Sequence, residues 1–361
     1  MINIPAFKAH VSIFVFIAMD INTVSEPSSA TSAAIFILTQ NTIARKVHLK
    51  NCLYFLFRNF NATYQYPVLI FHEGDYKVED QREIIMSIRA SCRSLVSFQT
   101  LDPADFSLPA HIDAVKAQRC VELKVTPYWR NMKYRMMCRW WSMLVWKYAS
   151  SYDYIMRLDD DSIIEEPITH DLFGWMAKNE LVYSSNILSV DCALCNYGFK
   201  ELLETMMDEM CPAKRESVAQ MFKPQEIPLR AVQFHPFRSL LSITEDPLPV
   251  LGEKLRVWGM VYFFNNYFIT KTAFWNRPDV KSALKYIDDS GLTFYRRLGD
   301  APIHTAIVGL FAKPSEIRRS VFKYSKRLQR EAFQGDDGEF HTYMPESYTS
   351  NGCITESTAQ K

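Results

Sequence analysis

The chain has 361 residues, 48% of them hydrophobic, and a formal net charge of +1 at pH 7. Such a chain can bury the core of one large domain or of two modest ones. The nearly balanced charge argues against binding of nucleic acid or of an anionic membrane through a global electrostatic field. The eight cysteines are an even number, which is compatible with disulfide bonds in a secretory compartment but does not require them.

The first part of the chain is a short apolar segment followed by a polar linker. Val11–Met19 is apolar but shorter than a helix that spans a bilayer. It fits the core of a signal peptide, the remnant of a signal anchor or an ordinary strand. Residues 20–32 are polar and rich in turn-forming residues, so we expect residues 1–32 to precede the folded domain.

Predicted strands and helices then alternate along the chain. Ala33–Thr39, Tyr66–Phe71 and Leu95–Phe98 are apolar runs typical of buried strands. Residues 44–65 and 78–92, which lie between them, have the character of helices. A β-α-β-α-β order of this kind predicts a parallel sheet with right-handed crossovers.

The second half of the chain continues this alternation. A helix is predicted at 131–150 and a buried strand at 152–158. Farther along, we expect a loop and short helix at 167–178, a strand at 181–188, a helix at 197–210, a strand or strand pair at 257–269, and helices at 279–289 and 302–312. The Pro-rich residues 211–250 indicate an insertion or long loop, and the polar residues after about Gln334 indicate a flexible tail.

Three aspartates, Asp159, Asp160 and Asp161, follow the strand predicted at 152–158. Asp159 and Asp161 are two residues apart, so in an extended chain both point the same way and can face one cation. Crowded carboxylates repel one another unless a cation neutralises them, and Mn²⁺ or Mg²⁺ bridging a diphosphate meets that need. Ligands of open α/β sheets bind beyond the carboxyl ends of strands, where these acids are predicted. The alternative is a solvated acidic turn or a helix N-cap.

A family pattern emerges from five segments in their order and spacing: Tyr66–Phe71, Tyr134–Ser142, Tyr154–Asp161, Tyr197–Phe199 and Gly299–His304. Together they resemble the fungal α-1,2-mannosyltransferase family, glycosyltransferase family 15. The second segment is similar to the family's YRxMCRF-type helix. The third lies where the family has a strand ending in Glu-Pro-Asp, and the last is similar to its GDAPxH motif. The resemblance covers most of the chain, from about Ala33 to Tyr324.

The resemblance implies an α/β fold of the GT-A nucleotide-sugar transferase type, Rossmann-like, with a mostly parallel central sheet flanked by helices. This domain would span residues 33–333, between the segment 1–32 and the tail 334–361. The implied activity is metal-dependent transfer of mannose from GDP-mannose to a mannose-terminated glycan or glycoprotein, with retention of configuration. The implied location is the lumenal side of the Golgi or secretory pathway, and membrane anchoring through the N-terminus stays open. No nucleic-acid partner is expected.

The resemblance also implies roles for particular side chains. Asp159 and Asp161 occupy the family's acidic positions and would hold Mn²⁺, or another divalent cation such as Mg²⁺. Asp160 falls on the family's proline and would point away. Arg135 and Arg139 are four residues apart on one helical face and would clamp the diphosphate of the donor. Without the family, a solvated basic face is the simpler interpretation of this arginine pair.

Further candidates would contact the sugars or the nucleotide. Asp300 and Asn266 would orient sugar hydroxyls, and His304 would lie near the metal or the diphosphate. Asp300 equally suits the N-cap of a helix with Pro302 in its first turn, which would leave His304 as an ordinary helix residue. Tyr134 would stack on the guanine or hydrogen-bond to the donor, with core packing as the alternative.

Two positions depart from the family pattern. Phe268 stands where the family carries a glutamate proposed as the catalytic nucleophile, in a segment of the type HFWSNFEI, and a phenyl group cannot attack an anomeric carbon. Lys326 lies in a stretch where the family has a histidine that assists metal binding, and it could neutralise phosphate instead. Besides a slipped alignment, Phe268 leaves three interpretations open: a front-face reaction without an enzymic nucleophile, a transferase with another donor or acceptor, or a catalytically impaired homologue acting as a glycan-binding or structural subunit.

Overall fold

The structure, a computed structural model, describes residues 31–122, 130–191, 193–228, 250–251, 254–326, 331–334 and 340–343. The apolar run Val11–Met19 and most of the predicted tail lie outside these ranges, so their roles stay predictions. Within the described ranges, no helix is both long enough and apolar enough to cross a membrane. Five of the cysteines described there are free thiols: Cys52, Cys92, Cys120, Cys138 and Cys211.

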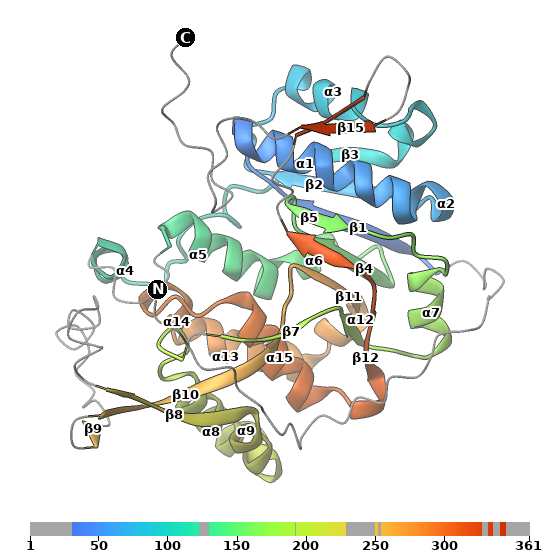
Figure 1. The fold of residues 1–361 in the computed structure, drawn as a ribbon. Helices are drawn as coiled ribbons and strands as arrows, with labels where there is room; N and C mark the ends of the chain where they lie inside the picture. The colour runs from blue at the N-terminus through green and yellow to red at the C-terminus, as the bar shows by residue number, and fades with distance from the viewer. Residues whose placement is uncertain are drawn as a thin grey trace.

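A seven-stranded sheet forms the centre of the fold, in the order β12-β6-β11-β4-β1-β2-β3 (Figure 1). Its strands are β1 (Ala33–Leu38), β2 (Val68–His72), β3 (Val96–Thr100), β4 (Tyr154–Leu158), β6 (Tyr183–Ser185), β11 (Tyr267–Lys271) and β12 (Ile317–Arg319). Strand β11 runs antiparallel to β4 and β6, and the other neighbouring pairs are parallel. The predicted mostly parallel sheet is therefore confirmed.

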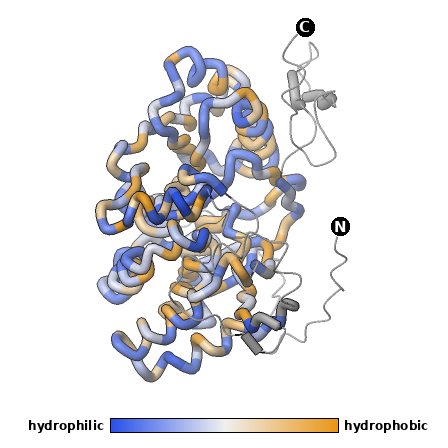
Figure 2. The backbone as a smooth tube through the Cα atoms, turned by 90° about the vertical axis from the view of Figure 1, so that its left-hand side faces the viewer, coloured by the Kyte–Doolittle hydropathy of each residue, from blue (hydrophilic) through white to orange (hydrophobic). Residues whose placement is uncertain are grey.

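The central strands are apolar at nearly every position because helices cover the sheet on both faces. In β1, Ala34 and Phe36 belong to one core, whereas Ile35 and Ile37 belong to the other, as the two-residue repeat of a strand requires. Figure 2 shows hydrophobic and hydrophilic residues alternating at short intervals along the backbone. This alternation is expected where each helix turns one face to a core and the other to solvent.

Two layers of helices sandwich the sheet. One face is covered by α1 (Ile43–Leu56), the π-helical turn η1 (Phe57–Asn61), α2 (Ala62–Tyr64), α3 (Val78–Met86) and α7 (Leu172–Lys178). The other face is covered by α5 (Met132–Arg139), the π-helical turn η3 (Trp140–Leu144), α6 (Val145–Tyr148), α8 (Phe199–Met210), α9 (Arg215–Met221), α12 (Thr272–Trp275), α13 (Pro278–Asp289) and α15 (Asp300–Phe311). The remaining described helices are η2 (Ala90–Leu95), α4 (Ala114–Glu122), η4 (Pro212–Lys214), α14 (Leu292–Tyr295) and η5 (Pro314–Glu316). The helix predicted at 131–150 is thus three helical pieces in series.

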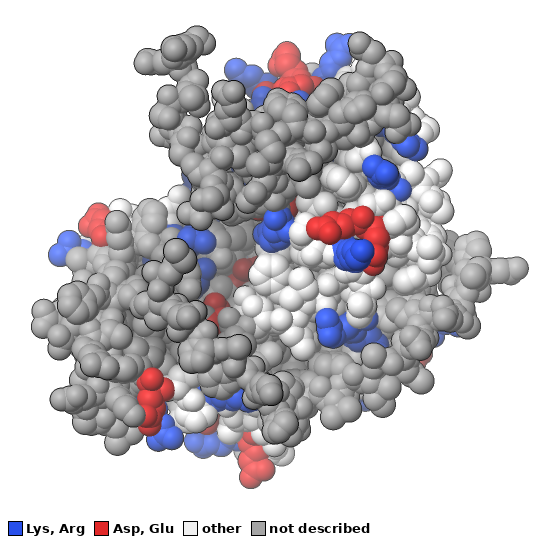
Figure 3. Space-filling model, in the orientation of Figure 1, with Lys and Arg blue, Asp and Glu red and all other residues white. Residues whose placement is uncertain are grey.

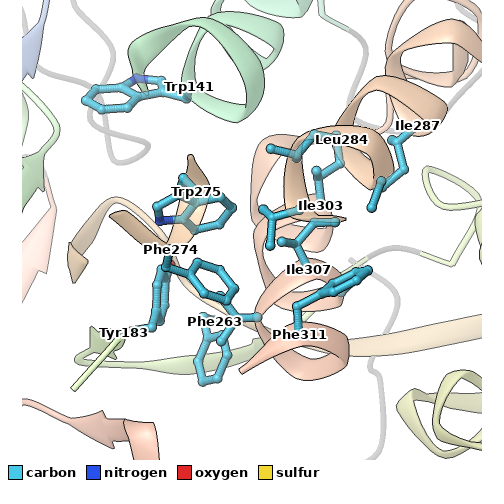
Figure 4. Close-up of a cluster of buried hydrophobic side chains, with 14 of the residues drawn as sticks. Trp141, Tyr183, Phe263, Phe274, Trp275, Leu284, Ile287, Ile303, Ile307 and Phe311 are labelled. Carbon is cyan, nitrogen blue, oxygen red and sulfur yellow. The ribbon is translucent and has the colours of Figure 1, made fainter. Parts of the chain in front are cut away.

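The core on the α15 side is rich in aromatic rings (Figure 4). Trp146 and Trp275 stack with ring centroids 4.3 Å apart and planes 4° from parallel. The indole nitrogen of Trp275 donates to Thr270 Oγ1 over 2.7 Å. Ile303 and Ile307 of α15 belong to the same cluster, and α15 is buried along nearly its whole length. Helix α15 therefore lies inside the core of this half of the domain.

Smaller sheets extend from this body. Their strands are β5 (Ser162–Ile164), β7 (Leu188–Val190), β8 (Phe222–Pro228), β9 (Val250–Leu251), β10 (Lys254–Phe263), β13 (Tyr324–Lys326), β14 (Glu331–Gln334) and β15 (Phe340–Tyr343). Strand β10 pairs antiparallel with β7, β8 and β9. Strand β13 pairs antiparallel with β5, which brings a late segment of the chain beside the turn that follows β4. Strands β14 and β15 pair where the tail was predicted to start.

The sequence predicts an insertion or long loop at 211–250. For residues 211–228 of this range, which the structure describes, the prediction is wrong. Residues 211–228 form η4, α9 and β8, and β8 pairs along its length with β10. Only scattered apolar residues anchor this segment, among them Val218 and Phe222, which are buried in the core. Such sparse anchors, set among prolines and charged residues, give no helical or strand period in the sequence.

We expect Trp275→Ala to lower the free energy of unfolding by about 3–5 kcal/mol, because it removes a buried indole and its stacking on Trp146 and leaves a cavity. Urea unfolding followed by circular dichroism measures this change. Val115→Ala is the control, since Val115 is 81% exposed, and should alter the free energy by less than about 0.5 kcal/mol. A loss for Trp275→Ala as small as the control's would contradict the packing described here.

Candidate functional site

The three aspartates follow β4 directly, as the sequence predicts. Strand β4 ends at Leu158, and the backbone N–H of Asp159 donates to the carbonyl of Asn266 over 2.9 Å. The N–H of Ser162 donates to the carbonyl of Asp159, also over 2.9 Å, which closes a tight turn before β5. The turn holds the acids at the carboxyl end of a central strand, where open α/β sheets bind ligands.

Asp159 and Asp161 face one cation, and that cation is the ammonium group of Lys326. Its Nζ lies 2.9 Å from Asp159 Oδ2 and 2.9 Å from Asp161 Oδ1. The pairing of β13 with β5 sets this position, because Lys326 lies opposite Ser162, the residue after Asp161. Burial acts against the charge of Lys326, but the two carboxylates hold the pKa of its ammonium above the usual value.

Asp160 points away from this pair, toward β1 and α1. Thr39 Oγ1 donates to Asp160 Oδ2 over 2.7 Å, and Arg45 Nη1 lies 3.1 Å from Asp160 Oδ1. The same Arg45 nitrogen lies 3.4 Å from Asp161 Oδ2. Burial raises the pKa of Asp160 to about 7 despite the neighbouring guanidinium.

Arg157, to which the sequence pattern assigned no role, connects Asp159 to Asp300. Its Nε donates to Asp159 Oδ1 over 2.9 Å, and its Nη1 donates to Asp300 Oδ2. The guanidinium lies over the ring of Trp141, 4.2 Å from the ring centroid. Burial opposes ionisation of both acids, but Arg157 holds the pKa of Asp159 and that of Asp300 below the usual value. The signal in the sequence was a charged residue inside an apolar strand, which is costly unless that charge is paired.

Two consecutive asparagines complete the polar cluster. Asn266 Nδ2 donates to Asp159 Oδ2, and Asn265 Nδ2 donates to Asp300 Oδ2 over 2.8 Å. The structure therefore brings together four of the predicted site residues, Asp159, Asp161, Asn266 and Asp300, with Arg157 and Lys326 among them.

His304 lies instead within the aromatic core. It is fully buried, its Nε2 is 3.0 Å from the carbonyl oxygen of Trp141, and its ring centroid is 4.7 Å from that of Trp275. Burial lowers the pKa of His304 to about 4, so the ring is neutral at pH 7. This environment favours a packing role, and the predicted catalytic role of His304 stays a prediction.

Phe268 is sealed in the same core. It lies on β11 directly opposite Arg157 and is fully buried. Its ring centroid is 5.3 Å from that of Tyr183 and 5.2 Å from that of His304. The position at which the family carries its glutamate is therefore filled by an apolar ring that packs against other rings.

A cavity of about 440 Å³ adjoins the acids. It is lined by Leu38, Thr39, Gln40, Arg45, Glu73, Phe106, Arg130, Asn131, Lys133, Tyr134 and Met137. Arg45 links the cavity to the polar cluster, because it lines the cavity and contacts Asp160 and Asp161. Tyr134 lies at the cavity as expected of a donor-binding residue, and Arg297 Nη2 donates to its hydroxyl over 3.4 Å. Figure 3 shows basic (blue) and acidic (red) side chains interspersed on one face of the molecule.

Arg135 and Arg139 lie on the opposite side of α5 from this cavity lining. Arg135 is buried and its Nη1 donates to the carbonyl oxygen of Phe294. Arg139 forms a bidentate ion pair with Asp288, with Nε 2.8 Å from Oδ1 and Nη2 2.9 Å from Oδ2. The two arginines do share a helical face, but in the structure that face packs against α13 and α14. Their role as a diphosphate clamp stays a prediction.

The described residues leave no open position for a divalent cation between Asp159 and Asp161. Mn²⁺ and Mg²⁺ take about six ligands, mostly oxygens, and at nucleotide sites one or two protein carboxylates, the phosphates and water supply them. In the described part of the chain, no group of three or more His, Cys, Asp or Glu side chains is arranged to hold a metal ion. The facing oxygens of Asp159 and Asp161 already contact Lys326 Nζ. A metal ion at this position would have to displace that ammonium group.

The sequence matches the family described as glycolipid 2-alpha-mannosyltransferase over residues 12–325. The chain belongs to this family. O-glycoside alpha-1,2-mannosyltransferase omh1 of Schizosaccharomyces pombe is 25% identical over 285 residues, which cover 76% of this chain and 65% of that protein. Glycolipid 2-alpha-mannosyltransferase 1 of Candida albicans is 24% identical over 264 residues, which cover 72% of this chain and 54% of that protein. The chain thus spans between 54% and 65% of the length of these curated relatives.

Solved structures of similar proteins share the fold. The mannosyltransferase Ktr4p of Saccharomyces cerevisiae in complex with GDP superposes with a TM-score of 0.65 at 18% identity, over 84% of this chain and 75% of that chain. Core-mannan synthase A (CmsA/Ktr4) of Aspergillus fumigatus in its Mn/GDP form gives a TM-score of 0.64 at 18% identity, over 83% of this chain and 76% of that chain. The GT-A-type α/β fold predicted from the sequence is confirmed.

Acid should destabilise the fold through His304. Its pKa is about 4 in the folded protein and about 6.5 in an unfolded chain, so between these values only the unfolded state binds the proton. Stability should fall by up to about 3 kcal/mol from this group alone as the pH drops from about 6.5 to about 4.

His304→Gln keeps an N–H donor for the carbonyl of Trp141 but does not titrate, so this variant should lose less stability over the same range. Urea unfolding of both proteins at pH 7, 5.5 and 4.5 measures the difference. Parallel pH profiles would show that His304 is not buried as a neutral ring.

Proposed function

We propose that this protein is a retaining α-1,2-mannosyltransferase that moves mannose from GDP-mannose to a mannose-terminated glycan in protein glycosylation. The observation that carries the proposal is the cavity beside the buried acid–base cluster at the carboxyl end of the sheet, joined to that cluster by Arg45. The family and the mannosyltransferase names of the relatives support the sugar. The GDP complex of a protein with the same fold supports the nucleotide.

The cavity suits a nucleoside diphosphate. Arg45, Arg130 and Lys133 line it and supply positive charge for the two phosphates. The ring of Tyr134 also lines the cavity, with the guanidinium groups of Arg130 and Arg297 5.3 Å and 5.4 Å from its centroid, and the guanine base would stack on it in place of one of them. On this basis we assign Tyr134 to donor binding.

Arg135 and Arg139 act as positioning residues in this proposal. They join α5 to α14 and α13 through Phe294 and Asp288, and Tyr134 is on the same helix. Their contacts therefore fix the helix from which Tyr134 reaches the cavity.

Because Phe268 provides no carboxylate, we propose that the reaction occurs on one face of the sugar. The bond between the anomeric carbon and the diphosphate oxygen breaks, and its electron pair goes to GDP. The acceptor hydroxyl oxygen forms the new bond on the same face, and its proton passes to the departing diphosphate. This step needs the hydroxyl held close to the anomeric carbon rather than an enzymic nucleophile.

We assign the sugar hydroxyls to Asp300 and Asn266, which belong to the polar cluster beside the cavity and not to the residues that line it. Arg157 orients Asp300, and Asp159 orients Asn266. His304 is assigned to the aromatic core in this proposal, since its ring is enclosed by Trp275, Phe268 and their neighbours.

The divalent cation predicted at Asp159 and Asp161 stays a prediction for this chain. A solved relative is described in a Mn/GDP form. In this chain Lys326 Nζ lies between the two carboxylates, so none of the steps above depends on a metal ion.

We place the activity on the lumenal side of the Golgi or secretory pathway, where glycans of glycoproteins are extended. The support is the family to which the chain belongs. Anchoring through the N-terminus is a prediction about residues that lie outside the described ranges.

A catalytically impaired homologue that binds glycans is the second candidate, and Phe268 is the observation that favours it. A protein of this kind would keep the cavity and its basic residues but would not complete the transfer.

Incubation of the protein with GDP-mannose and α-methyl mannoside should yield an α-1,2-linked dimannoside, identified by mass spectrometry and NMR spectroscopy. The same reaction with UDP-galactose or GDP-fucose should yield none. Product from another sugar nucleotide, but none from GDP-mannose, would refute the choice of donor. Binding of GDP-mannose without any product, with or without added Mn²⁺, would establish the impaired homologue instead.

Tyr134→Ala should weaken the binding of GDP by roughly 5- to 150-fold, because stacking of a base on an aromatic ring contributes about 1–3 kcal/mol. Isothermal titration calorimetry measures the dissociation constant. Tyr134→Phe keeps the ring and is the matched control, with an expected change of less than about threefold. Equal affinities for the alanine variant and the wild-type protein would mean that Tyr134 serves packing alone.

A further inference from the structure

Lys326 occupies the position that the sequence pattern assigns to a divalent cation. Its Nζ is equidistant, at 2.9 Å, from Asp159 Oδ2 and Asp161 Oδ1. These are the two oxygens that an ion shared between the carboxylates would contact. The ammonium comes from 167 residues farther along the chain than Asp159, so the contact is a product of the tertiary fold.

The strand that carries Lys326 holds it in this place. Strand β13 pairs with β5 over three residues, with Tyr324 opposite Ile164 and Lys326 opposite Ser162. The hydroxyl groups of Tyr324 and Ser162 also share a hydrogen bond of 2.6 Å. Strand register and side-chain hydrogen bonding thus both direct the ammonium to the acids.

The site is built around this charge. The side chain of Asp161 is 2% exposed and that of Lys326 is 25% exposed, so the pair is largely removed from water. A divalent ion could enter only by displacing the ammonium, which would then lose both of its carboxylate partners. Without either cation, Asp159 would still pair with Arg157 and Asp161 with Arg45, but no positive charge would lie between the two facing carboxylates.

Lys326 also has capacity for a ligand. An ammonium group has three N–H donors. Two are used by Asp159 and Asp161, and among the described contacts the third has no protein acceptor. Arg45, which lines the cavity, and Lys326 contact different oxygens of Asp161, so a single carboxylate connects the ammonium to the cavity wall.

We propose that the ammonium group of Lys326 is the resident cation of this site and binds the diphosphate of the donor, so that the protein binds its nucleotide without a divalent metal ion. The identity of the ligand rests on the proposed function. Lys326 and Arg45 together would stabilise the negative charge of the departing diphosphate, which is the task of the metal ion in metal-dependent transferases.

The wild-type protein provides the first test. Its dissociation constant for GDP, measured by isothermal titration calorimetry, should agree within about threefold between buffer with EDTA and buffer with Mn²⁺. Electron paramagnetic resonance of Mn²⁺ should detect no bound ion at micromolar protein. A loss of affinity of about tenfold or more in EDTA would overturn the proposal.

In the Lys326→Ala variant, by contrast, the affinity for GDP should depend on Mn²⁺. In EDTA its affinity for GDP should fall by about tenfold or more, because a charge-assisted hydrogen bond is lost. Added Mn²⁺ should restore the affinity and raise the melting temperature of this variant, since Asp159 and Asp161 are then open to the ion. Lys323→Ala removes an exposed lysine from the same segment and should behave as the wild-type protein does. Unchanged affinity of Lys326→Ala in EDTA would contradict the proposal.

A second variant keeps the test possible if Lys326→Ala does not fold. Lys326→His offers a neutral ring at the same place and should bind Mn²⁺ together with the two aspartates. Failure of the wild-type protein to bind GDP in any buffer would refute the proposed function and the diphosphate as the ligand of Lys326, but not the place of Lys326 as the resident cation. In that case the resonance of Mn²⁺ without nucleotide decides: ion bound by the variants but not by the wild-type protein supports the inference, and equal binding overturns it.

Discussion

The ion pairs of Arg157 are the interaction on which both the fold and the candidate site depend. A guanidinium inside an apolar central strand is costly to bury, and it is tolerated because Asp159 and Asp300 both reach it and Trp141 covers its face. Those partners come from the end of β4, the start of α15 and the helical turn η3. One buried charge therefore fixes the relative positions of the central sheet and the helices that enclose the aromatic core.

The sequence was informative wherever local chemistry decides the outcome. Central strands were recognisable because burial on both faces makes them apolar throughout, and two carboxylates two residues apart had to face the same way. The sequence did not reveal which residues those side chains contact in the folded protein. Helical spacing shows that Arg135 and Arg139 share a face, but only the packed structure shows that this face meets Asp288 and the Phe294 carbonyl. The role of Arg157 needed Asp300, which lies 143 residues away.

The two departures from the family pattern lie beside the same acids and offset each other in charge. Phe268 faces Arg157 across the strand pair, so a carboxylate there would have been a further negative charge near that guanidinium. Lys326 supplies one positive charge where a divalent ion would supply two. A glutamate with a divalent ion and a phenylalanine with a lysine carry the same net charge. Asp160, which falls on the family's proline, adds a further carboxylate to the site, and Arg45 contacts it.

The pairing of β13 with β5 makes the order of synthesis matter for this domain. All seven strands of the central sheet have been synthesised once Arg319 has been added, yet the acids at the end of β4 still lack Lys326. The cluster is neutralised only after the segment up to β13 emerges and folds back over 162 residues onto β5. A shortened or fused version that stops before Tyr324 would therefore contain the complete sheet but lack the ammonium group that bridges Asp159 and Asp161. The boundary of the functional domain is set by the chemistry of its ligand site, a few residues beyond the boundary of its architecture.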